Sequence, residues 1–101
     1  MIGKERAYLK KLAHSEKPIL QLGKDGLSEN FLKELEQTLE MKELVKLDLL
    51  PGSGDKKLMV EEILEKTKAE FISQVGRKLV LYRESSTLPR EERLNPARKV
   101  R

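Results

Sequence analysis

The chain has 101 residues, of which 21 are Lys or Arg and 17 are Asp or Glu, so its formal net charge is +4; it contains no cysteine. This length suits one domain with a modest core, and the lack of cysteine excludes disulfides, thiolate metal sites and thiol catalysis. No apolar run approaches the ~20 residues of a membrane span, and the N-terminus lacks the apolar core of a signal peptide. We therefore expect a cytoplasmic protein that does not enter a membrane.

Charge is unevenly distributed along the chain. Residues 1–26 carry six basic and three acidic side chains, residues 27–70 carry seven and eleven, and residues 71–101 carry eight and three. Two basic ends and an acidic middle predict a folded protein with one positive side, which favours a polyanionic partner.

The first helix is predicted over residues 4–14, where four apolar residues recur at helical spacing and the remaining surface is basic. Pro18 prevents its continuation, and a short strand follows at Ile19–Leu22. Next comes the loop Gly23–Gly26, and Ser28 is suited to cap a second helix. Glycines allow a close approach of the backbone, and the free N–H groups of a helix N-terminus suit a phosphate.

The second helix is predicted to bury a stripe formed by Phe31, Leu32, Leu35 and Leu39. Its other side is acidic and is expected to face solvent. The acidic residues are Glu34, Glu36, Glu40 and Glu43.

Residues 44–50 alternate between apolar and polar and predict a strand, which ends at a turn over residues 51–54. A third helix is predicted from about Lys56 to Lys68, and two strands, 70–76 and 78–83, are separated by a turn at Gly76-Arg77. The second of these strands is apolar on both faces and is expected inside the sheet, while Phe71 is expected in the core. The fold class is α/β: a single compact domain in the order α-β-α-β-α-β-β, with helices packed on a four-stranded mixed sheet.

The C-terminal segment, residues 85–101, changes in composition. It combines serine, threonine and proline with five basic residues, and composition predicts that it is flexible. The basic residues are Arg90, Arg93, Arg98, Lys99 and Arg101.

No residues suggest catalysis, a metal or another cofactor. His14 is the only histidine, and it suits the end of the first helix; without a second histidine or a cysteine, a transition-metal site is not expected. Ser28 is explained as a helix cap, because no Ser-His-Asp pattern accompanies it. We therefore expect a protein that is not an enzyme and has no small-molecule substrate.

Three blocks of sequence together resemble a known family. They are Gly3-Lys4 with Tyr8–His14, Lys17–Ser28, and Val75–Arg83. In this order and spacing, residues 1–84 resemble the CRM RNA-binding domain, in particular its free-standing bacterial form, the YhbY family. The resemblance implies a fold similar to the C-terminal domain of translation initiation factor 3. It also implies RNA binding and association with precursors of the large ribosomal subunit.

The expected RNA site combines the Gly-x-x-Gly loop, as in RNA binders that clamp a backbone with such a loop, with a basic face. Its residues are Lys4, Lys10, Lys11, Gly23, Lys24, Asp25, Gly26, Arg77 and Lys78, with Lys17 and Arg83 as weaker candidates. Only four residues are aromatic, so we expect recognition of phosphates and shape, with little reading of bases. We also expect a monomer. The tail either lies along RNA or is solvated. The alternative function is a protein adaptor whose acidic helix binds a basic partner, such as a ribosomal protein.

Overall fold

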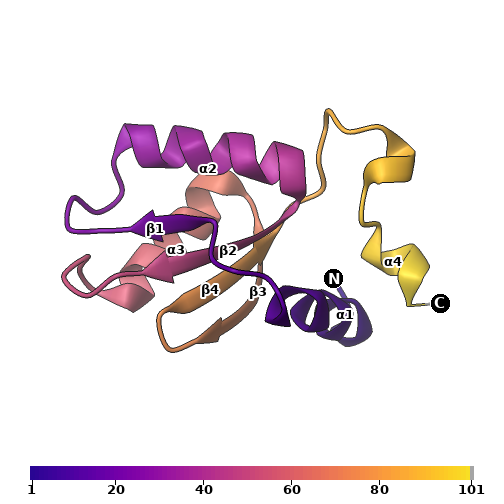
Figure 1. Cartoon of the computed structure of the whole chain (residues 1–101), viewed down its shortest axis with the longest axis horizontal. Helices are drawn as coiled ribbons and strands as arrows, with labels where there is room; N and C mark the ends of the chain where they lie inside the picture. Colours follow the sequence, from indigo (N-terminus) through magenta and orange to yellow (C-terminus); the bar gives the residue numbers. More distant parts are fainter. Residues whose placement is uncertain (101) are drawn as a thin grey trace.

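The helices and strands follow one another in the predicted order in the computed structural model, which describes residues 1–100 (Figure 1). The elements are α1 (Gly3–His14), β1 (Leu20–Leu22), α2 (Glu29–Lys42), β2 (Leu44–Leu49), α3 (Lys56–Thr67), β3 (Glu70–Val75) and β4 (Lys78–Tyr82). A short 3-10 helix (Arg90–Glu92) and α4 (Pro96–Lys99) follow in the C-terminal segment.

The four strands form one mixed sheet in the order β1-β2-β4-β3. β1 runs parallel to β2, whereas β4 runs antiparallel to both β2 and β3. β4 therefore lies inside the sheet, as its apolar sequence predicts. The expected fold class, an α/β domain with helices packed on a four-stranded mixed sheet, is confirmed.

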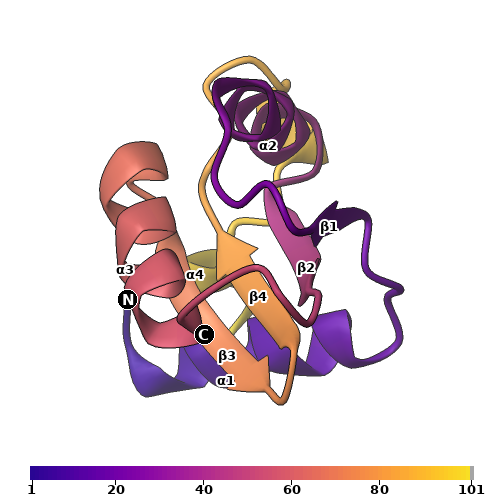
Figure 2. The same ribbon diagram turned by 90° about the vertical axis from the view of Figure 1, so that its left-hand side faces the viewer.

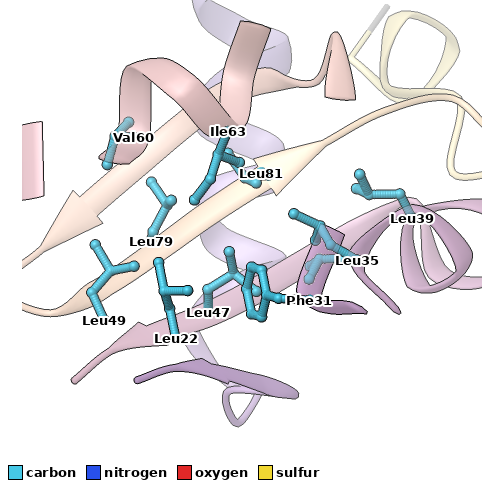
Figure 3. Close-up of a cluster of buried hydrophobic side chains, with 11 residues drawn as sticks. Leu22, Phe31, Leu35, Leu39, Leu47, Leu49, Val60, Ile63, Leu79 and Leu81 are labelled. Atoms are coloured by element: carbon cyan, nitrogen blue, oxygen red, sulfur yellow. The ribbon is translucent and has the colours of Figure 1, made fainter. Parts of the chain in front are cut away.

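Helices cover both faces of the sheet (Figure 2). On one face, α2 and α3 pack against the alternate apolar residues of β2 and β4, and Figure 3 shows leucines from the sheet meeting Phe31, Leu35 and Ile63. On the other face, Leu9 and Ala13 of α1 pack in a second cluster with residues of β3 and β4. The molecule thus has three layers, with the sheet in the middle.

Phe71 does not lie in the core, which corrects the sequence-based prediction. Its exposed fraction is 37%, and the neighbouring Ile72 is buried in the second cluster instead. The pairing of β3 with β4 shifts in register between Phe71 and Ser73. β3 is also an edge strand, so its side chains are covered on fewer sides.

Several residues of the C-terminal segment between Ser85 and Pro96, for which composition predicts flexibility, contact the domain. Glu43, which was expected to face solvent, is fully buried. Its carboxylate accepts hydrogen bonds from the backbone N–H of Ser85 (2.7 Å) and of Leu94 (2.6 Å). Leu94 packs against the second cluster, and Pro96 is buried. Burial of a charged carboxylate is tolerated here because backbone N–H groups satisfy it.

Two other carboxylates of the acidic helix side also have partners within the chain. Glu40 accepts a hydrogen bond from the backbone N–H of Ser86 (2.8 Å) and another from the Ser86 hydroxyl, and these bonds lower the Glu40 pKa below its usual value. Glu36 lies 2.7 Å from a guanidinium nitrogen of Arg83. Glu34 is exposed, as expected. In the described part of the chain, no helix is both long and apolar enough to cross a membrane.

Candidate nucleic-acid interface

Three connecting segments meet at one end of the sheet. β1 and β2 are parallel, so residues 23–26 and 51–54 leave the sheet at the same end. β4 begins there too, because Lys78 pairs with Asp48 near the end of β2, and this places the turn 76–77 beside them. The N–H of Leu50 donates to the Leu22 carbonyl (3.0 Å), and that of Leu49 donates to the Arg77 carbonyl (2.8 Å). We call these three segments the loop end, which faces the viewer in Figure 2.

The Gly-x-x-Gly loop is a tight turn with an exposed crest. The Gly26 N–H donates to the Gly23 carbonyl (3.0 Å), and Lys24 and Asp25 between them are exposed. Gly26 has φ +66°, a conformation that favours glycine. Gly23 has no such φ, and an added Cβ would meet only Leu50 Cδ1, at 3.8 Å. The fold therefore accounts for glycine at position 26 but not at position 23.

Two helices begin at the loop end. Ser28 caps α2 by accepting from the N–H of Phe31 (3.0 Å), as predicted, and Asp55 caps α3 by accepting from the N–H of Leu58 (3.2 Å). The first turn of α3 holds no acidic residue; its first two positions are the exposed Lys56 and Lys57. Cations are unfavourable beside the positive end of a helix dipole; the Asp55 carboxylate offsets part of this effect, and the two exposed ammonium groups can pair with a bound anion.

Lys56 and Lys57 were not among the residues expected from the sequence. Their position at the loop end follows from the parallel pairing of β1 with β2, which brings the starts of α2 and α3 to one end of the sheet. The signal in the sequence that could have indicated them is the run of two lysines directly after Asp55, the cap of this helix.

Arg77 and Lys78 converge on one carboxylate. Lys78 Nζ donates to Asp48 Oδ2 at 2.8 Å, and Arg77 Nε lies 3.0 Å from Asp48 Oδ1. The hydrogen bond from Lys78 holds the pKa of Asp48 below its usual value, with the charges of both cations adding to the effect. Asp48 is 5% exposed, whereas the side chains of Arg77 and Lys78 are 44% and 37% exposed. One buried carboxylate thus orients two cations that still reach solvent.

A hollow of about 310 Å³ lies between the C-terminal half of α1 and the β3–β4 side of the sheet, next to the loop end. Four of its lining residues carry nitrogen-bearing side chains and come from three elements: Lys10, His14, Lys46 and Lys78. The rest of the lining is mainly apolar: Ala13, Val75 and Val80, with Ser73. We call it the α1–β3 hollow. Of the residues expected from the sequence, it brings Lys10 and Lys78 together.

Other expected residues lie elsewhere. Lys4 belongs to the N-terminal half of α1, which approaches the opposite end of the sheet, where Arg6 lies 3.9 Å from Glu70. Lys11 is exposed, and its position about 200° around the helix from the buried Leu9 turns it away from the sheet.

The two weaker candidates are not at the loop end either. Lys17 lines a separate hollow with Leu12 and Ile19. Arg83 donates to the Thr67 carbonyl (2.7 Å) in addition to pairing with Glu36, a structural role. Within residues 1–100, no cluster of His, Asp and Glu is arranged to hold a metal ion.

Comparison with known proteins places these features in a family. The model of the CRS1 / YhbY (CRM) domain matches residues 1–83. The chain is 33% identical to the Probable RNA-binding protein YqeI of Bacillus subtilis (strain 168), over 84% of this chain and 90% of that protein. It is 39% identical to a Haemophilus influenzae protein named RNA-binding protein, over 81% and 84% of the two chains.

A solved structure agrees with these relatives. The solution structure of SAV1595 from Staphylococcus aureus, a candidate RNA-binding protein, covers 88% of this chain with a TM-score of 0.73 and 40% identity, and 94% of that chain is matched. The matched family region contains the Gly-x-x-Gly loop, both helix starts and the α1–β3 hollow. The chain belongs to the CRS1 / YhbY (CRM) domain family.

Proposed function

We propose that this protein binds structured RNA through the loop end and the α1–β3 hollow, and that its RNA belongs to the precursor of the large ribosomal subunit. The observation that carries the proposal is the convergence, at one end of the sheet, of a glycine-containing loop, two helix N-termini and exposed cations. The names of the relatives support RNA as the partner, and the family resemblance supports the ribosomal precursor.

Phosphate is the group that this end suits best. A phosphate near Gly23 meets the backbone of the loop and the exposed Lys24 ammonium, while the first turn of α3 adds Lys56 and Lys57. Such contacts fix the protein on its RNA without reading sequence. Selectivity then comes from the shape of the RNA, which must reach the loop and the hollow together.

The test compares two charge-matched double variants on one RNA. Lys24→Gln with Lys57→Gln removes one cation from the loop end and one from the adjoining first turn of α3, whereas Lys42→Gln with Lys66→Gln removes two from the last turns of α2 and α3. Each lost phosphate contact lowers the slope of log affinity against log salt by about 0.7–0.9, so we expect a fall of about 1.5 for the first pair and little change for the second. Equal falls in the salt slope for the two pairs would contradict the placement of the RNA site at this end of the sheet.

The choice of RNA is tested separately. Crosslinking in cells followed by sequencing of the bound RNA should recover precursor rRNA of the large subunit. Recovery of unrelated transcripts alone would refute that part of the proposal and leave RNA binding intact. The adaptor alternative has less support, because Glu36, Glu40 and Glu43 are engaged within the chain.

A further inference from the structure

We propose that the α1–β3 hollow holds one unpaired nucleotide of the bound RNA, with its base on the apolar floor and its phosphate against the lysines of the rim. This inference rests on the proposed function and specifies it further. Besides recognising phosphates and shape, the protein would then prefer an RNA that has an unpaired nucleotide beside a helical segment.

The floor of the hollow is apolar and open to solvent. Val75, near the end of β3, is 72% exposed, and Ala13 and Val80 lie with it in the lining. A β-branched residue this exposed on an edge strand leaves apolar surface in contact with water, which a bound planar base would remove. His14 also lines the hollow, and histidine is one of the residues on whose side chain unpaired bases stack.

The rim is positively charged and largely fixed in place. Lys46 Nζ donates to the carbonyls of Ala13 (3.3 Å) and Glu16 (3.2 Å), so it is anchored at the end of α1. Lys78 is anchored on Asp48. Lys10 forms no ion pair within the described residues. Lys78 is paired with Asp48, and Lys10 and Lys46 have no carboxylate partner within residues 1–100, so the rim is net positive over an apolar floor. This complements a nucleotide, which joins a flat base to an anionic phosphate.

Size and position favour an unpaired nucleotide over a paired one. A volume of about 310 Å³ is at the lower limit of small-ligand sites, roughly 300–1,000 Å³. A base within a duplex is stacked and cannot enter, whereas a bulged or looped base can be turned outward. Because Lys78 lines the hollow and directly follows the turn at Arg77, a strand that contacts the loop end continues into the hollow.

The experiment measures the affinity of two RNAs: a perfect hairpin duplex and the same hairpin with one bulged nucleotide. Ser73→Leu places a larger apolar side chain in the hollow without changing charge. Gln74→Leu is the matched control, because Gln74 pairs with Leu79 and faces the other side of the sheet. His14→Ala is a second variant at an exposed helical position, where folding is not at risk.

For the wild type we expect about fivefold tighter binding of the bulged hairpin, the lower range for stacking one base. Ser73→Leu and His14→Ala should reduce this preference toward one, because both lie in the hollow, and Gln74→Leu should keep it. Equal wild-type affinity for both RNAs, or a preference that survives both hollow variants, would overturn the nucleotide site and leave the proposed function standing. If the wild type bound neither the duplex nor the bulged hairpin, the proposed function itself would be refuted.

Discussion

Removing the Glu43 carboxylate should strongly destabilise the fold. Glu43→Ala leaves the N–H groups of Ser85 and Leu94 without their acceptor, at positions that are buried and partly buried. A hydrogen bond to a charged group contributes about 1.5–3 kcal/mol, so two give an upper value of about 6 kcal/mol. The C-terminal segment can detach and hydrate these groups, which limits the loss. We therefore expect the free energy of unfolding to fall by about 3 kcal/mol.

Urea denaturation followed by circular dichroism measures this change, and the melting temperature should fall by roughly 10–20 °C. Glu34→Ala is the control, because Glu34 is exposed on the same helix and its loss should cost less than about 0.5 kcal/mol. Hydrogen exchange adds a local readout: the Ser85 and Leu94 amides should be protected in the wild type and lose protection in Glu43→Ala. A Glu43→Ala protein as stable as Glu34→Ala would refute the docking of the C-terminal segment through this carboxylate.

Three further predictions concern the candidate interface. Gly23→Ala should change stability by less than about 0.5 kcal/mol, because the added Cβ makes only an ordinary contact with Leu50, yet it should weaken RNA binding measurably in a filter assay; unchanged affinity would remove close backbone approach from the mechanism. Lys10→Ala should lower the salt slope of RNA binding by about 0.7–0.9 and Lys11→Ala by less, and the reverse order would contradict the orientation of α1. The pKa of Asp48 is lowered in the folded protein, so Asp48 stabilises the fold at a pH above its pKa in the unfolded chain, and this stabilisation is lost as the pH falls through its pKa in the folded protein. Acid denaturation should therefore show a shallower loss of stability below about pH 4 for Asp48→Asn than for the wild type. Identical pH profiles for the two proteins would contradict the ion pair.

Local patterns were sufficient to predict the order of helices and strands. The apolar run of β4, the Ser28 cap and the turn at Gly76-Arg77 each depend on residues that are neighbours in sequence. Such signals are the strongest available from one sequence. The shifted register that exposes Phe71 depends on how β3 pairs with β4, and no pattern within β3 itself reveals it.

Long-range contacts account for what the sequence did not reveal. Ser85 and Leu94 are 42 and 51 residues from Glu43, so composition alone made residues 85–101 resemble a flexible tail and Glu43 a surface residue. The candidate site shows the same limit. Lys24 was predicted from its own loop, whereas Lys57 joins it only through the parallel pairing of β1 with β2.

The most direct test of the central claim is an amide NMR titration of the protein with a structured RNA hairpin that carries one bulged nucleotide. We predict that the largest shifts fall on the loop end (residues 23–26, 51–54 and 76–77), on the first turn of α3 and around the α1–β3 hollow, while the exposed side of α2 near Glu34 shifts little. Shifts concentrated on α2 or on the N-terminal half of α1, with the loop end unchanged, would contradict the account.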